Sequence, residues 1–223
     1  MAHLDPASGV FISMKSNTKI LIVIGALALI VLGYFGITKY QREAIPARTT
    51  EVVERAAYNF NFTYTGGEDG YSFVEPPLTD AVKAQGIEAV YILMNAHEYT
   101  AYQALPEGGE APKSMTVFVL KKEEESTTTA ATNTPDIDKE TRIKQWAEKN
   151  SSLSAYNLAQ GTPDIVEVDG VKLLHYRADG LYPQETYITY YRGHYLLFVG
   201  QYDGEGDVMK SDFEALIQSL TFL

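Results

Sequence analysis

The sequence predicts an α+β domain, a central antiparallel sheet flanked by helices, preceded by one N-terminal transmembrane helix. Three observations predict it: an uncharged apolar run at residues 20–37, strand pairs joined by tight-turn dipeptides, and helical stripes of apolar residues. We divide the chain into a short tail (1–19), a membrane segment (20–37), a juxtamembrane stalk (38–50) and the α+β domain (51–223).

The membrane segment, Ile20–Ile37, contains no charged residue and is apolar on every face. At about 1.5 Å per residue it covers roughly 27 Å, enough to span a bilayer core. It is longer than the apolar region of a cleaved signal peptide, so we expect an uncleaved signal anchor in the cell membrane. Basic residues flank both ends, and the short tail before a large domain predicts an extracytoplasmic C-terminal domain. Either Met1 or Met14 is the natural start.

Composition excludes several classes of function. The 223 residues include 29 Asp and Glu against 18 Lys and Arg, and the formal charge of −11 argues against nucleic-acid binding. The chain has no cysteine, so disulfides, thiolate catalysis and Cys-ligated metal sites are excluded.

The first half of the domain contains strand patterns separated by turns. Gly66–Gly70 predicts a turn, His97–Leu105 is either a strand or a short helix, and Glu123–Asn133 has no large apolar residue and reads as an exposed loop. The predicted strands are Tyr58–Tyr64, a strand beginning at Tyr71–Val74, Glu88–Met94 and Ser114–Lys121.

The second half begins with a helix for which Thr134 is the expected N-cap and Pro135 the first helical residue. Its apolar stripe is Ile143, Trp146 and Ala147, and it is expected to end near Asn150. Two hairpins and a last amphipathic helix follow. The hairpins pair Asp164–Asp169 with Val171–Arg177 and Gln184–Arg192 with His194–Tyr202, and the last helix carries Phe213, Leu216, Ile217 and Leu220.

Several of these segments together resemble the PsbP-like family, named for an extrinsic subunit of photosystem II, and especially its membrane-anchored bacterial relatives. The resemblance covers roughly Thr50–Leu223 and implies an accessory or binding protein rather than an enzyme with a shared site. The segments that carry it are the strand Tyr58–Tyr64, Tyr71–Pro76, Trp146–Asn150, Val168–Lys172, Ala178–Tyr182 and the terminal pattern from Asp212 to Phe222.

One acidic loop has the spacing of a calcium site. Asp203, Glu205, Asp207 and Glu214 fall at positions 1, 3, 5 and 12 of a calcium-binding loop. However, Val208 replaces the glycine of position 6, and the loop follows a strand. The alternative is a strand-to-helix turn whose acids favour the positive helix N-terminus.

A tyrosine-rich sheet face is the other candidate site. Tyr182, Tyr187, Tyr191 and the loop at Asp179 are the residues we expect in a recognition surface, because tyrosine rings give rigid contact area. The same tyrosines equally suit a sheet packed under helices. His175 and His194 have no catalytic context in the sequence.

We therefore expect a membrane-anchored, extracytoplasmic, non-enzymatic accessory protein, held in the bilayer through residues 20–37, that binds an envelope protein partner and no cofactor. A calcium-binding envelope protein and an enzyme of unrecognised type are the alternatives.

Overall fold

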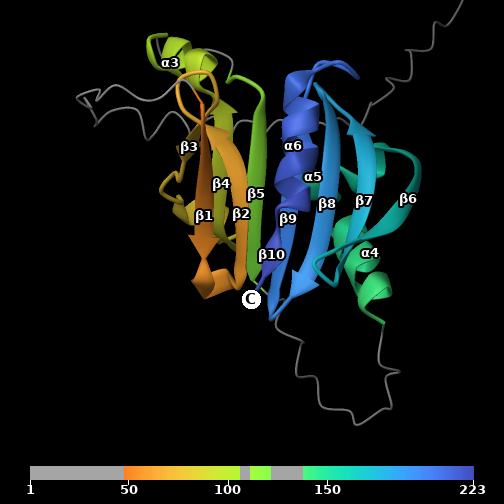
Figure 1. Ribbon diagram of the computed structural model, residues 1–223. Coiled ribbons are helices and arrows are strands. Elements are labelled where there is room, and N and C mark those ends of the chain that lie inside the picture. The colour runs from red at the N-terminus through yellow and green to blue at the C-terminus, as the bar shows by residue number, and fades with distance from the viewer. Residues whose placement is uncertain (1–47, 106–110, 122–137) are drawn as a thin grey trace, which may run out of the picture.

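The computed structural model describes residues 48–105, 111–121 and 138–223. A seven-stranded antiparallel sheet forms the middle of the molecule (Figure 1). In spatial order its strands are β3 (Tyr71–Val74), β4 (Ile87–Asn95), β5 (Ser114–Lys121), β9 (His194–Gln201), β8 (Pro183–Tyr191), β7 (Val171–Asp179) and β6 (Ala159–Val168).

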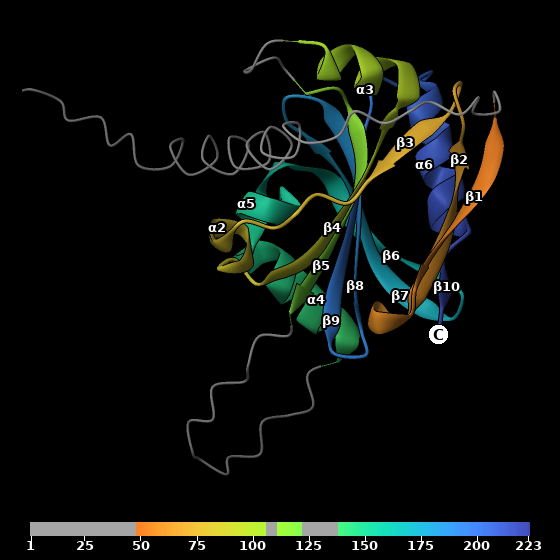
Figure 2. The ribbon, with the colours of Figure 1, turned by 90° about the vertical axis from the view of Figure 1, so that its left-hand side faces the viewer.

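Helices cover one face of this sheet (Figure 2). The other face is covered by a small sheet and one helix, which together we call the front layer. Two short 3-10 helices are connectors: η1 (Ala56–Tyr58) joins β1 to β2 within the small sheet, and η2 (Tyr156–Leu158) joins α5 to β6. The helices of the opposite face are α2 (Asp80–Lys83), α4 (Lys139–Lys149) and α5 (Ser151–Ser154), with α3 (Ala96–Gln103) at one end. The front layer consists of β1 (Thr49–Arg55), β2 (Phe60–Gly66), β10 (Thr221–Phe222) and α6 (Val208–Gln218).

Each face of the central sheet buries its own core. On the helical face, Trp146 of α4 stacks on Tyr195 of β9 with ring centroids 4.7 Å apart. On the front face, Phe213 of α6 packs directly on the backbone of Gly200, where an added Cβ would lie 2.3 Å from the ring. Gly200 therefore lets α6 approach the centre of the sheet.

The two predicted hairpins are confirmed. Asp169 and Gly170 join β6 to β7 with φ values of 48° and 73°, and Arg192 and Gly193 join β8 to β9 with 43° and 90°. Both pairs have the positive φ values that a two-residue hairpin turn of this hand requires.

Some predicted boundaries differ from the structure, and one ambiguous segment is resolved. The N-cap of α4 is Asp138, whose carboxylate accepts from two backbone amides, so the prediction of a cap at Thr134 was wrong. Strand β1 begins at Thr49, inside the segment assigned to the stalk. The ambiguous segment after β4 is the helix α3, because the Asn95 side chain accepts from the amides of His97 and Glu98.

The α+β prediction is confirmed for the described residues. Among these residues no helix is both long and apolar enough to cross a bilayer. The predicted anchor at 20–37 and the predicted loop at 123–133 lie outside them.

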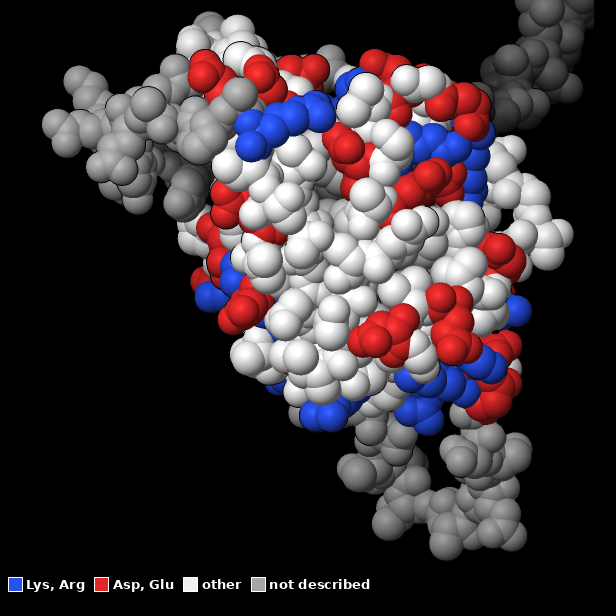
Figure 3. Space-filling model, in the orientation of Figure 1, with Lys and Arg blue, Asp and Glu red and all other residues white. Residues whose placement is uncertain are grey.

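Charge is distributed unevenly over the molecule (Figure 3). We call the end with the β2–β3 turn, α3 and the loop before α6 the upper end, and the end with the β8–β9 turn and the start of α4 the lower end, as in Figure 1. Acidic side chains line much of the upper end, interspersed with basic ones, and basic side chains gather along the lower end beside several acidic ones.

Candidate functional site: a polar pocket at the upper end

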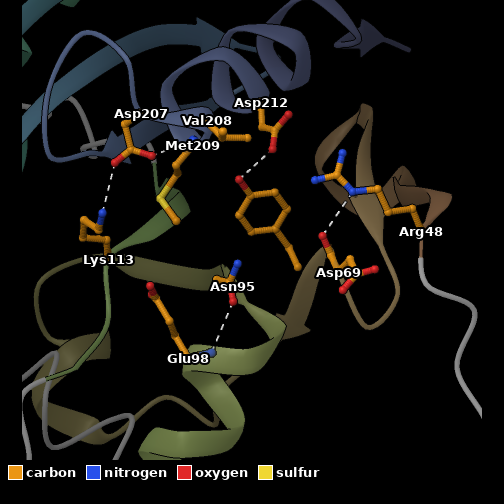
Figure 4. Close-up of a pocket in the computed structure, with 11 residues that line it drawn as sticks. Arg48, Asp69, Asn95, Glu98, Lys113, Asp207, Val208, Met209 and Asp212 are labelled. Atoms are coloured by element: carbon orange, nitrogen blue, oxygen red, sulfur yellow. Dashed lines mark hydrogen bonds and ion pairs between the residues drawn. The ribbon is translucent and has the colours of Figure 1, made fainter.

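A pocket of about 100 Å³ opens at the upper end, where the N-termini of α3 and α6 meet the β2–β3 turn (Figure 4). The two N-caps place these helices. Asn95 ends β4 and caps α3, while Asp207 caps α6 by accepting from the Met209 amide at 2.9 Å. Side chains from the first two turns of both helices, Glu98 and Asp212, therefore reach the pocket.

Lys113, just before β5, forms one wall of the pocket. Its Nζ donates to Asp203 and to Asp207, the latter at 3.0 Å, and its side chain is only 16% exposed. Burial opposes the charge, but the hydrogen bonds to the two carboxylates raise the pKa of Lys113 overall. For Asp207, burial is outweighed by hydrogen bonds from the Asp203 and Met209 amides and from Lys113, which together lower its pKa.

Tyr71 and Asp212 form the opposite wall, with the Tyr71 hydroxyl donating to Asp212 at 2.8 Å. Burial and this carboxylate raise the pKa of Tyr71, so the phenol stays neutral. At the mouth, Arg48 donates to the carbonyl of Asp69 at 3.2 Å. Within the described residues, the Glu98 carboxylate makes no hydrogen bond or ion pair.

The pocket therefore carries more acids than bases. Its lining includes four carboxylates, against the two cations Arg48 and Lys113. Lys113 is already bound by two carboxylates, so the electrostatic balance of the pocket favours a further cation. The acids are Asp69, Glu98, Asp207 and Asp212.

The four acids of the predicted calcium loop do not converge on one point. Asp203 and Asp207 bind Lys113, and Glu205 binds Arg177 at 2.7 Å and Lys210 at 2.6 Å. Glu214 lies exposed on α6. In the part of the chain that the structure describes, no three His, Asp or Glu side chains are grouped to hold a metal. Calcium binding stays a prediction.

The predicted tyrosine surface is spread along the full length of β8. Asp179 and Tyr182 lie at the upper end, whereas Tyr191 is the last residue of the strand, at the lower end. The Tyr191 hydroxyl donates to the carbonyl of Leu223, and its ring packs against Phe222 of the front layer. Tyr187 lies between His175 and Phe213. Tyr187 and Tyr191 pack partly against the front layer, and a recognition role for these residues stays a prediction.

Sequence reasoning missed the environment of His175. Its Nδ1 lies 2.9 Å from Asp164 of β6 and its Nε2 lies 2.7 Å from Glu185 of β8, while its ring stacks on Tyr187 at 4.4 Å. Carboxylates only accept hydrogen bonds, so two of them require a donor on each ring nitrogen, which is the imidazolium. The hydrogen bond to Glu185 is the main cause of the raised pKa of His175, which burial opposes.

Tyr202 completes this cluster by donating to the other Glu185 oxygen at 3.1 Å. Both ring nitrogens of His175 are therefore engaged, which leaves none to act as a base on a substrate. The Asp164 contact follows from the register of the Asp169-Gly170 hairpin, in which Asp164 lies directly opposite His175, and sequence reasoning did not use it. The Glu185 contact depends in addition on how β7 pairs with β8. His194 pairs with Glu88 at 3.1 Å, and the exposed His97 pairs with Asp69.

The comparisons with known proteins gave a similarity to solved structures. No model of a known protein family matches the chain, and no curated protein matches it. Among solved structures, it is similar to the solution structure of cyanobacterial PsbP (CyanoP) from Synechocystis sp. PCC 6803, with a TM-score of 0.47 and 14% identity over 84% of this chain and 98% of that one.

Proposed function

We propose that the chain is a non-enzymatic binding protein, anchored by residues 20–37 and exposed outside the cytoplasmic membrane, whose upper-end pocket takes a basic side chain of an envelope partner. The observation that carries this proposal is the size and charge of the pocket. Sites for small-molecule substrates and cofactors usually enclose about 300–1,000 Å³. A pocket of about 100 Å³ with a surplus of carboxylates suits the end of one lysine or arginine side chain.

The position of the pocket limits where its partner lies. The first described residue, Arg48, is at the mouth of the pocket, and the predicted anchor ends at residue 37. The residues between them reach at most roughly 35–40 Å when fully extended. The upper end therefore stays close to the bilayer, and the partner segment is a membrane-proximal one.

Crosslinking followed by pull-down from native membranes tests the pocket, using the full chain and the variant Glu98→Gln. Loss of a charge-assisted hydrogen bond weakens binding by about tenfold. The control Glu148→Gln removes the same charge from an exposed position on α4, in another layer of the fold. Recovery of a stoichiometric partner that falls only with Glu98→Gln supports the proposal. Equal recovery with both variants, or no partner at all, contradicts it.

The absence of cysteine allows a clean test of location. A single cysteine introduced by Leu181→Cys, in the β7–β8 turn, replaces a side chain that is 73% exposed. We expect a membrane-impermeant maleimide to label it in intact cells or spheroplasts. Labelling that requires lysis would place the domain in the cytoplasm and overturn the proposed location.

A further inference from the structure

The lower end carries three cations that have no carboxylate partner among the described residues. We call Lys139, Arg142 and Arg192 the lower-end cations; the first two belong to α4 and the third to the β8–β9 turn. Each lies instead over a tyrosine ring. Lys139 Nζ and Arg192 Cζ are both 5.7 Å from the centroid of Tyr191, and Arg142 Cζ is 5.4 Å from that of Tyr190. These distances are within the range of cation–π contacts.

Three acids at the same end have partners other than the lower-end cations. The Asp138 carboxylate accepts from the Glu140 amide at 2.7 Å and from the Thr141 amide and hydroxyl, as the cap of α4. Glu140 binds Lys172 at 2.6 Å, and Asp169 accepts from the Phe222 amide at 2.7 Å. None of these acids forms an ion pair with the lower-end cations, although the formal charge of the chain is −11.

Lys139 has no carboxylate to stabilise its charge, although its side chain is exposed overall. Partial burial of the ammonium lowers the pKa of Lys139. At the upper end, by contrast, Lys113 recovers that loss from two carboxylates. A carboxylate supplied from outside would do the same for the lower-end cations.

We propose that the lower-end cations, with Tyr190 and Tyr191, form a docking surface for an acidic segment of a partner protein. Guanidinium groups bind carboxylates in a bidentate manner, and arginine and tyrosine are enriched among the residues that dominate binding energy at protein interfaces. The surface is distinct from the pocket of the proposed function: it lies at the other end of the molecule and selects the opposite charge.

A protein fits this surface better than other polyanions. The high overall negative charge disfavours approach of a nucleic acid. An anionic bilayer is also disfavoured, because β1 runs from Arg48 at the upper end down to the lower end (Figure 1). Arg48, the described residue nearest in sequence to the predicted anchor, therefore lies at the end opposite these cations. Neither argument applies to a short acidic protein segment that approaches from the aqueous side.

Fluorescence anisotropy tests the surface, with the full chain in an uncharged detergent and a labelled deca-glutamate peptide as the probe. We expect saturable binding at low salt that weakens at least tenfold in the double variant Lys139→Gln/Arg192→Gln. The matched control, Lys83→Gln/Lys149→Gln, removes the same charge from the ends of α2 and α4 that lie away from the surface, and we expect a change below about twofold.

Three outcomes would overturn this inference. The first is no binding of the peptide, and the second is an equal loss in both double variants, which would reflect net charge alone. The third is binding to vesicles of anionic lipid with no binding to the peptide, which would assign the surface to the membrane. Glu98→Gln should leave peptide binding unchanged, so this result is independent of the upper-end pocket.

Discussion

A lysine at each end of the molecule has a different kind of partner. At the upper end, Lys113 donates to Asp203 and Asp207, and nearby Arg177 and Lys210 share Glu205. At the lower end, Lys139 lies against the ring of Tyr191 with no carboxylate partner in the described chain. The same kind of side chain therefore stabilises the fold at one end and remains available to a partner at the other.

This contrast distinguishes cations that stabilise the fold from cations that are placed to bind a partner. A cation whose partners come from distant parts of the chain, as Lys113 and Asp207 do, holds those parts together. A cation that contacts only a ring already fixed by packing contributes little to folding, so its placement points to binding. Equal substitutions at the two ends should therefore have different consequences.

The largest difference is expected between Lys113→Met and Lys139→Met. The first leaves Asp207, whose side chain is 16% exposed, without its cation, and we expect it to lower the free energy of unfolding by about 2 kcal/mol. The second removes an exposed ammonium, and we expect a change within about 0.5 kcal/mol. Urea unfolding at pH 7 measures both. Similar losses in the two variants would show that the ends do not differ.

A smaller, pH-dependent effect on the free energy of unfolding is expected at His175. Its pKa is raised in the folded state, so its contribution to stability is complete below the unfolded value of about 6.5 and is lost as pH rises through the folded value. Glu185 has a lowered pKa because its hydrogen bond from His175 outweighs burial, so it stays ionised at pH 5.5.

The stability difference between wild type and His175→Gln, measured by urea unfolding, should therefore be largest near pH 5.5–6 and shrink toward pH 9. A difference that grows with pH would contradict the imidazolium bound by two carboxylates.

The smallest effect is expected from calcium. Because Asp203, Glu205 and Asp207 are paired with lysine and arginine side chains, millimolar calcium added after EDTA should leave Tm essentially unchanged. Specific binding at 100 times Kd would add about 2.7 kcal/mol and raise Tm by several degrees. Such a rise would restore the calcium-loop hypothesis and show that the upper-end ion pairs are exchangeable.

Local signals in the sequence predicted the hairpins and the amphipathic helices well. Asp169-Gly170 and Arg192-Gly193 adopt the positive φ values of tight hairpin turns. The apolar residues Ile143, Trp146 and Ala147 are buried, as their helical spacing predicts. Strand β1 was missed, because only Val53 of its residues is buried and the alternation is weak. It is an outer strand of a small sheet, so its sequence is largely polar.

The two charged sites differ in how far the sequence could predict them. Lys113 meets Asp207 across 94 residues, which no local pattern indicates. His175 lies opposite Asp164 in the predicted hairpin, but its contact with Glu185 depends also on the pairing of β7 with β8. The acidic spacing at Asp203 to Glu214 was correctly noticed as a concentration of charge. The sequence does not show, however, where Lys113 lies, so it could not predict that the protein's own cations pair with these acids.

The strand order has a consequence for how the chain folds. Strand β5 pairs with β9, rather than with the next strand along the chain, and the Thr63 amide donates to Ser219 across 156 residues. Contacts so distant in sequence make folding slow, and they leave the apolar faces of β4 and β5 open until β9 and α6 have been synthesised. If the domain folds outside the cytoplasmic membrane, it crosses as an unfolded chain with these strands exposed. A holding chaperone on the far side would then determine its yield more than its final stability does.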